Sequence, residues 1–160
     1  MTVLARAAAL AAAVTIAAAS SAEAQAGTIR VTIAGGPHAG TYQMSDQCEV
    51  TPGKFPALHI MAFDAAITAP PKGPRTMEFF STDGKGKPDG FVVAVKFQKE
   101  NYEIYAIPKE QQPAGRALAQ KGRGTMTMKQ TPAGRTATFR GQTAEGVKME
   151  GTVECRNRSS

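Results

Sequence analysis

The chain has 160 residues, with 19 lysines and arginines against 13 aspartates and glutamates, so its net charge is +6. This length suits one ordinary domain with a real hydrophobic core. Beyond the N-terminal segment no apolar run approaches the roughly 20 residues that a membrane span requires, so we expect no membrane span.

The first residues have the pattern of a secretory signal peptide. Arg6 precedes a mostly alanine run over residues 7–19, and Ala24-Gln25-Ala26 supplies a small-x-small cleavage site. The run is too short for a membrane anchor, and no cysteine precedes Cys48 to accept a lipid. We therefore expect residues 1–26 to be removed, leaving a soluble exported protein that is periplasmic or secreted.

Alternating apolar and polar residues predict short strands from residue 28 onward. In the first, the apolar residues at 29, 31 and 33 alternate with Thr28, Arg30 and Thr32, which indicates one wet face. The strand over 57–64 differs because both of its faces are largely apolar, so it is either covered on both sides or lines a pocket. The other expected strands cover residues 41–50, 75–81, 91–98, 102–107 and 124–131, followed by a closing hairpin, Thr136–Cys155, with its turn at Gln142–Gly146.

The only helical candidate lies between Pro108 and Gly124, where Pro113 suits a first helical position. It is either a short helix or an ordered loop. About eight or nine short strands, separated by glycine and proline turns, predict an all-β fold. The architecture is an antiparallel sandwich or barrel over residues 27–155, with a disordered tail at 156–160.

The two cysteines, Cys48 and Cys155, fall on strands where alternate apolar residues share their parity. In an exported chain, a pair of cysteines favours one disulfide over a redox or metal pair. The bond would tie the closing hairpin to the N-terminal part of the domain.

No catalytic motif is present in the sequence. It has no Gly-x-Ser-x-Gly, no His-Glu-x-x-His and no cysteine–histidine dyad apart from the expected disulfide. The glycines after the first strand precede a poor helix former, so they indicate a turn and not a phosphate-binding loop. We expect a protein that is not an enzyme and has no cofactor.

His59 and Met61 form the sharpest local feature, because residues two apart on a strand project from one face. Imidazole and thioether suit Cu(I), and the spacing resembles the His-x-Met end of periplasmic copper chaperones, so copper is the alternative cofactor. In the alternative interpretation, Met61 fills core space and His59 is a hydrogen-bonded or rim histidine. We also expect a binding pocket or contact patch here, formed by His59, Met61, Phe63, Phe80 and Tyr105.

Positive charge is concentrated between Gln112 and Ala144, where no acidic residue occurs. Such a field attracts anionic partners, and in an exported protein these are lipid head groups, lipopolysaccharide or acidic glycans, not nucleic acid. The alternative is a solvated face that aids solubility. The predicted basic patch comprises Arg116, Lys121, Arg123, Lys129, Arg135 and Arg140.

The closing run resembles that of the small exported mycobacterial lipoprotein antigens. The matching residues are Gly141, Thr143, Ala144, Gly146, Val147, Gly151, Val153 and Cys155, with Cys48 as the partner cysteine. This resemblance implies a disulfide-closed β domain associated with the cell envelope and without catalysis. The lipid-attachment cysteine of that family is missing, so a membrane anchor is not implied.

The leading hypothesis is therefore an exported, non-catalytic domain of the cell envelope or periplasm that binds an anionic or amphiphilic ligand. One alternative is a periplasmic copper-binding protein that uses His59 and Met61. The other is a purely structural or adhesive surface domain.

Overall fold

The computed structural model describes residues 25–51, 57–64, 73–82, 90–112 and 120–156. Nine antiparallel strands form a single sheet in the order β6-β5-β4-β3-β2-β1-β9-β8-β7. The expected all-β antiparallel fold is confirmed. The strands are β1 (Gln25–Ala34), β2 (Gly40–Val50), β3 (Leu58–Phe63), β4 (Thr76–Ser81), β5 (Phe91–Lys96), β6 (Asn101–Ala106), β7 (Arg123–Thr131), β8 (Gly134–Gln142) and β9 (Lys148–Arg156).

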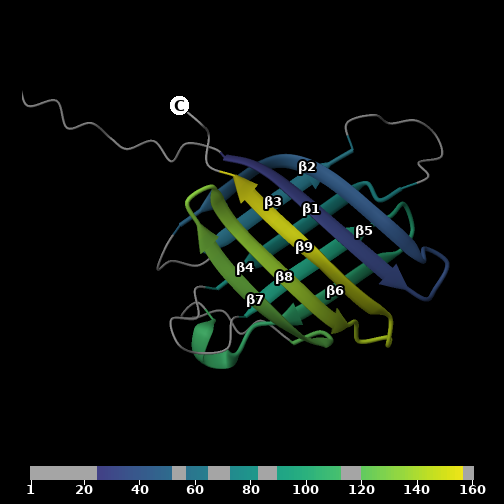
Figure 1. Ribbon diagram of the computed structural model, residues 1–160. Coiled ribbons are helices and arrows are strands. Elements are labelled where there is room, and N and C mark those ends of the chain that lie inside the picture. Colours follow the sequence, from purple (N-terminus) through teal and green to yellow (C-terminus); the bar gives the residue numbers. More distant parts are fainter. Residues whose placement is uncertain (1–24, 52–56, 65–72, 83–89, 113–119, 157–160) are drawn as a thin grey trace, which may run out of the picture.

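The sheet curls until its two end strands, β6 and β7, meet. The N–H of Tyr105 donates to the carbonyl oxygen of Lys121 at 2.7 Å, which forms a single bridge just before β7 begins. In Figure 1, β1, β9, β8 and β7 lie in front, and β3 to β6 cross behind them. Of the two architectures that the sequence left open, the fold is therefore a nearly closed barrel.

The alternation of apolar and polar residues sends one side of each strand into the barrel. In β1, Ile29, Val31 and Ile33 are at most 1% exposed, while the residues between them face outward. The centre holds three phenylalanine rings, Phe79, Phe91 and Phe139, whose centroids lie 5.7–6.2 Å apart. Side chains thus occupy the middle of the barrel, as in small filled barrels.

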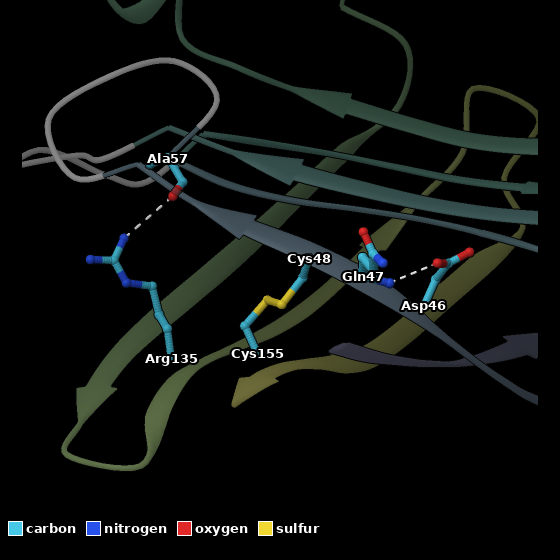
Figure 2. The surroundings of a disulfide bond; sticks show 6 residues. All are labelled: Asp46, Gln47, Cys48, Ala57, Arg135 and Cys155. Atoms are coloured by element: carbon cyan, nitrogen blue, oxygen red, sulfur yellow. Dashed lines mark hydrogen bonds between the residues drawn. A yellow bond between two sulfur atoms is a disulfide. The ribbon is translucent and has the colours of Figure 1, made fainter. Parts of the chain in front are cut away.

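The predicted disulfide is confirmed between Cys48 of β2 and Cys155 of β9 (Figure 2), with the two Cα atoms 6.0 Å apart. Both of these strands pair with β1, so the bond passes over β1 on its inner side. It does so at Gly27, where an added Cβ would lie only 2.8 Å from Cβ of Cys48 and 3.0 Å from its Sγ. The missing side chain at Gly27 makes room for the bond, a requirement that we did not predict from the sequence.

The predicted boundaries of three segments differ from those of the structure. β1 begins at Gln25, so the expected cleavage after Ala26 falls inside this strand, and the signal peptide itself stays a prediction. β9 includes Arg156, one residue beyond the expected end of the domain, and the rest of the predicted tail lies outside the described residues. Within the segment predicted as a helix or ordered loop, the structure describes a short 3-10 turn, η1 (Lys109–Gln111). Residues 113–119 of that segment lie outside the described residues.

Among the described residues, no helix is long and apolar enough to cross a membrane.

Candidate functional site

The predicted aromatic residues lie together on the outer surface of the barrel. His59 of β3 is opposite Phe80 of β4, which is opposite Val92 of β5, which is opposite Tyr105 of β6. The strand β3 is thus not covered on both sides. Its alternate residues, Leu58, Ile60 and Ala62, are buried in the core, while His59 and Met61 are half-buried outside and Phe63 is 58% exposed.

This outer face is acidic as well as aromatic. Nε2 of His59 lies 3.6 Å from Oε1 of Glu78, and Nζ of Lys121 lies 3.4 Å from Oε2 of Glu103. Burial raises the pKa of Tyr105, and the negative charges of Glu103 and Glu78 raise it further. Lys121 of this face has a carboxylate partner already, and the two glutamates reduce the attraction for an anionic ligand here.

His59 and Met61 share the outer face of β3, as the predicted copper pair requires. The imidazole, however, faces the carboxylate of Glu78. Among the described residues, no group of three histidine, cysteine, aspartate or glutamate side chains is placed to hold a metal ion. Copper binding by these two residues stays a prediction.

Other histidine and methionine side chains that could complete a copper site with His59 and Met61 lie elsewhere. His38 is in the β1–β2 turn, where its ring stacks on Phe97 at 3.9 Å and its Nε2 lies 2.9 Å from Oε2 of Glu100. The remaining candidates belong to the core or pack against it, on the opposite side of the sheet from His59. These are Met44, Met77, Met126 and Met128.

The predicted basic patch does not form one surface. Lys121 is paired with Glu103 on the aromatic side of the barrel. Arg135 extends to the carbonyl oxygen of Ala57, which Nη1 approaches to 3.5 Å (Figure 2). Lys129 lies near the other end of β7 from Arg123, and Arg116 is outside the described residues. Among the five described members, Arg123 and Arg140 line a common hollow.

That hollow belongs to the outer surface of β1, β9, β8 and β7. These strands pair in unbroken register over nine residues at each junction, so outward side chains line up in rows across them. Two hollows of about 600 and 630 Å³ lie on this surface. They have four lining residues in common, Thr32, Thr125, Arg140 and Glu150, and so form one continuous depression, which we call the cationic groove.

Four cationic side chains line the cationic groove against one carboxylate, that of Glu150. None of the four forms an ion pair with a described residue, although Arg140 is directly opposite Glu150 in the register. The guanidinium groups are instead steadied by neutral partners: Arg140 donates to Oγ1 of Thr125 at 3.4 Å and Arg123 to Oε1 of Gln142 at 3.2 Å. The four cations are Arg30, Arg123, Arg140 and Lys148.

Two of these cations, Arg30 and Lys148, were not among the predicted site residues. They lie outside residues 112–144, on β1 and β9. The pairing of β1 with β9, and of β9 with β8, brings them onto the same surface as Arg123 and Arg140. The sequence carried one signal for Arg30, its place on the wet face of the first strand.

No protein-family model, curated protein or solved structure matches this chain. The chemistry of the cationic groove therefore rests on its own side chains. Arginine forms paired hydrogen bonds to carboxylate, sulfate or phosphate groups, and exposed, unpaired cations require little rearrangement to do so. The resemblance to the mycobacterial antigens stays a prediction.

Proposed function

We propose that this chain is an exported, non-catalytic binding domain of the periplasm or cell envelope, and that the cationic groove binds an anionic partner. The observation that carries the proposal is the set of four cations without ion-pair partners among the described residues. An anion entering the groove gains their attraction without breaking any ion pair of these residues.

The filled interior supports an anionic ligand over an amphiphilic one. A lipid-binding barrel needs space for an acyl chain inside, whereas the rings of Phe79, Phe91 and Phe139 meet in the centre here. The outward surface of the groove strands is also polar, since threonine, arginine, lysine and glutamate predominate on it. This surface offers charged groups and hydrogen bonds beside the apolar stems of the same side chains.

The test is binding of a fluorescent dextran sulfate, with neutral dextran as the reference polymer. The variant replaces three groove cations, Arg123, Arg140 and Lys148, by alanine. Each exposed ion pair is worth about 0.2–1 kcal/mol, so the triple variant should bind about 3- to 150-fold more weakly. Binding of the unmodified protein should also weaken as salt is added, because salt screens exposed charges.

A matched triple variant removes three exposed lysines from other surfaces, Lys96, Lys99 and Lys109, and lowers the net charge equally. It should bind nearly as well as the unmodified protein. Equal losses in the two triple variants would mean that net charge alone attracts the polymer. Failure of the unmodified protein to bind any polyanion would overturn the proposal and favour a structural or adhesive role.

A further inference from the structure

We infer that the anionic partner of the cationic groove is a linear acidic polysaccharide lying along the groove strands. The inference rests on the proposed function, since it names the class of anion that this same groove takes. It comes from the different chemistry of the two ends of the groove and from the carboxylate between them.

One end of the groove has a row of three hydroxyl groups, which Arg30 of β1 extends beyond Thr152. Thr127, Thr138 and Thr152 are direct neighbours across β7, β8 and β9, about 4.8 Å apart from strand to strand. The other two threonines that line the groove are engaged: Oγ1 of Thr32 lies 2.9 Å from Oγ1 of Thr41, and Oγ1 of Thr125 accepts a hydrogen bond from Arg140. The three in this row make no hydrogen bond to a described side chain, and each hydroxyl offers one donor and two acceptor sites.

The other end of the groove is cationic. Arg123 and Lys148 lie on either side of Gln142, in one row across β7, β8 and β9. From Thr138 to Gln142 the chain of β8 advances four residues, about 14 Å at the rise of a strand. A ligand that uses both ends must be extended, with hydroxyl groups as well as charges.

Glu150 lies between these ends, opposite both Thr32 and Arg140. Its carboxylate repels a negative charge placed beside it, whereas Arg140 in the same row attracts one. A densely charged chain such as polyphosphate meets this repulsion at every position. A polysaccharide with charges separated by hydroxyl-bearing carbons can place its anionic groups near the cations and its hydroxyls near Glu150.

Single-stranded nucleic acid fits the groove less well. Proteins that bind it supply aromatic side chains on which the bases stack. On the outward side of β1, β9, β8 and β7 no aromatic residue occurs. The groove thus offers cations, hydroxyls, one carboxylate and one amide but no aromatic ring, which suits a charged polyol.

The first experiment measures affinity against ligand length. Oligogalacturonates of one to eight units compete with the fluorescent dextran sulfate for the unmodified protein. The octamer should bind at least about tenfold more tightly than the monomer, because only an extended chain reaches both ends of the groove. Equal affinity per anionic group, with no gain on lengthening, would overturn the inference of an extended ligand.

The second experiment removes hydroxyls and keeps every charge. The double variant Thr138→Val, Thr152→Val should bind the octamer several-fold more weakly, while its affinity for polyphosphate of equal charge is unchanged. Thr76→Val, on the opposite side of the barrel, should alter neither. Unchanged octamer binding, or equal losses for both polymers, would show that the groove recognises charge alone.

The third experiment tests Glu150 itself. Glu150→Gln should tighten polyphosphate binding more than octamer binding, and Glu154→Gln, outside the hollows on the same strand, should change both less. Equal gains for the two polymers would refute the role of Glu150 in selection. Failure of the proposed function would look different, because the unmodified protein would then bind none of the polyanions.

Discussion

Removal of the Cys48–Cys155 bond should destabilise the domain without affecting the cationic groove. The bond closes a loop across a sequence separation of 107 residues. In the chain-entropy model, a cross-link of this span lowers the entropy of the unfolded chain enough to stabilise the fold by about 4–5 kcal/mol, as an upper value. For a domain of this size the melting temperature should fall by roughly 12–20 °C.

The assay is urea unfolding of the oxidised protein, the reduced protein and the double variant Cys48→Ala, Cys155→Ala. Reduction keeps both sulfur atoms in place, so the difference between reduced protein and double variant reports lost packing around these buried side chains. The dependence of unfolding free energy on urea should steepen on reduction, because the unfolded chain is then less compact.

A loss of less than about 1 kcal/mol on reduction would refute this reasoning, since unfolded-state entropy would then not be the main contribution of the bond. The reduced, folded protein should still bind polyanions, because the disulfide lies inside the barrel and the groove outside. If binding vanished while the fold persisted, the cysteines themselves would belong to the site.

Two further predictions concern the barrel interior and its end. Gly27→Ala should lower the free energy of unfolding by about 1–3 kcal/mol, as is typical of overpacking, because the new Cβ would lie 2.7 Å from Cδ1 of Ile60 and 2.8 Å from Cβ of Cys48. Gly73→Ala is the matched control, since an added Cβ there meets nothing within 4 Å. Equal effects of the two substitutions in urea unfolding would contradict the explanation. Burial and, next, the charge of Glu100 raise the pKa of Tyr102 above the usual value of about 10, so the unfolded chain loses this proton first and stability should fall as the pH rises above about 10. Across that pH range, the melting temperature of Tyr102→Phe should fall less steeply than that of the unmodified protein. Identical slopes of melting temperature against pH would count against the shifted pKa.

The strands were predictable because each carries its own signal. In β1, apolar residues at alternate positions mark one face, whereas β5 is a short run of five apolar residues that are all buried. Glycine and proline turns between strands end each run. The disulfide was predictable for a different reason: only two cysteines exist, and both have inward parity. For β3 the same pattern was ambiguous, since His59, Met61 and Phe63 look apolar enough to be buried.

The candidate site was only partly predictable. Counting charge along the chain grouped Lys121 and Arg135 with Arg123, yet the barrel turns these three toward different partners. The count also missed Arg30, because nothing local in the first strand indicates that it will pair with the last.

The sequence by itself thus determined the strands, their inward faces and the covalent link, because these depend on local alternation and on a unique pair of cysteines. Only the tertiary structure decided that the sheet curls into a barrel, that β1 lies beside β9, and that the absence of a side chain at Gly27 makes room for the disulfide. Those outcomes depend on strand order and register, which are contacts between residues far apart in the chain. The cationic groove is of this second kind, since its cations come from four strands and meet only when the sheet is assembled.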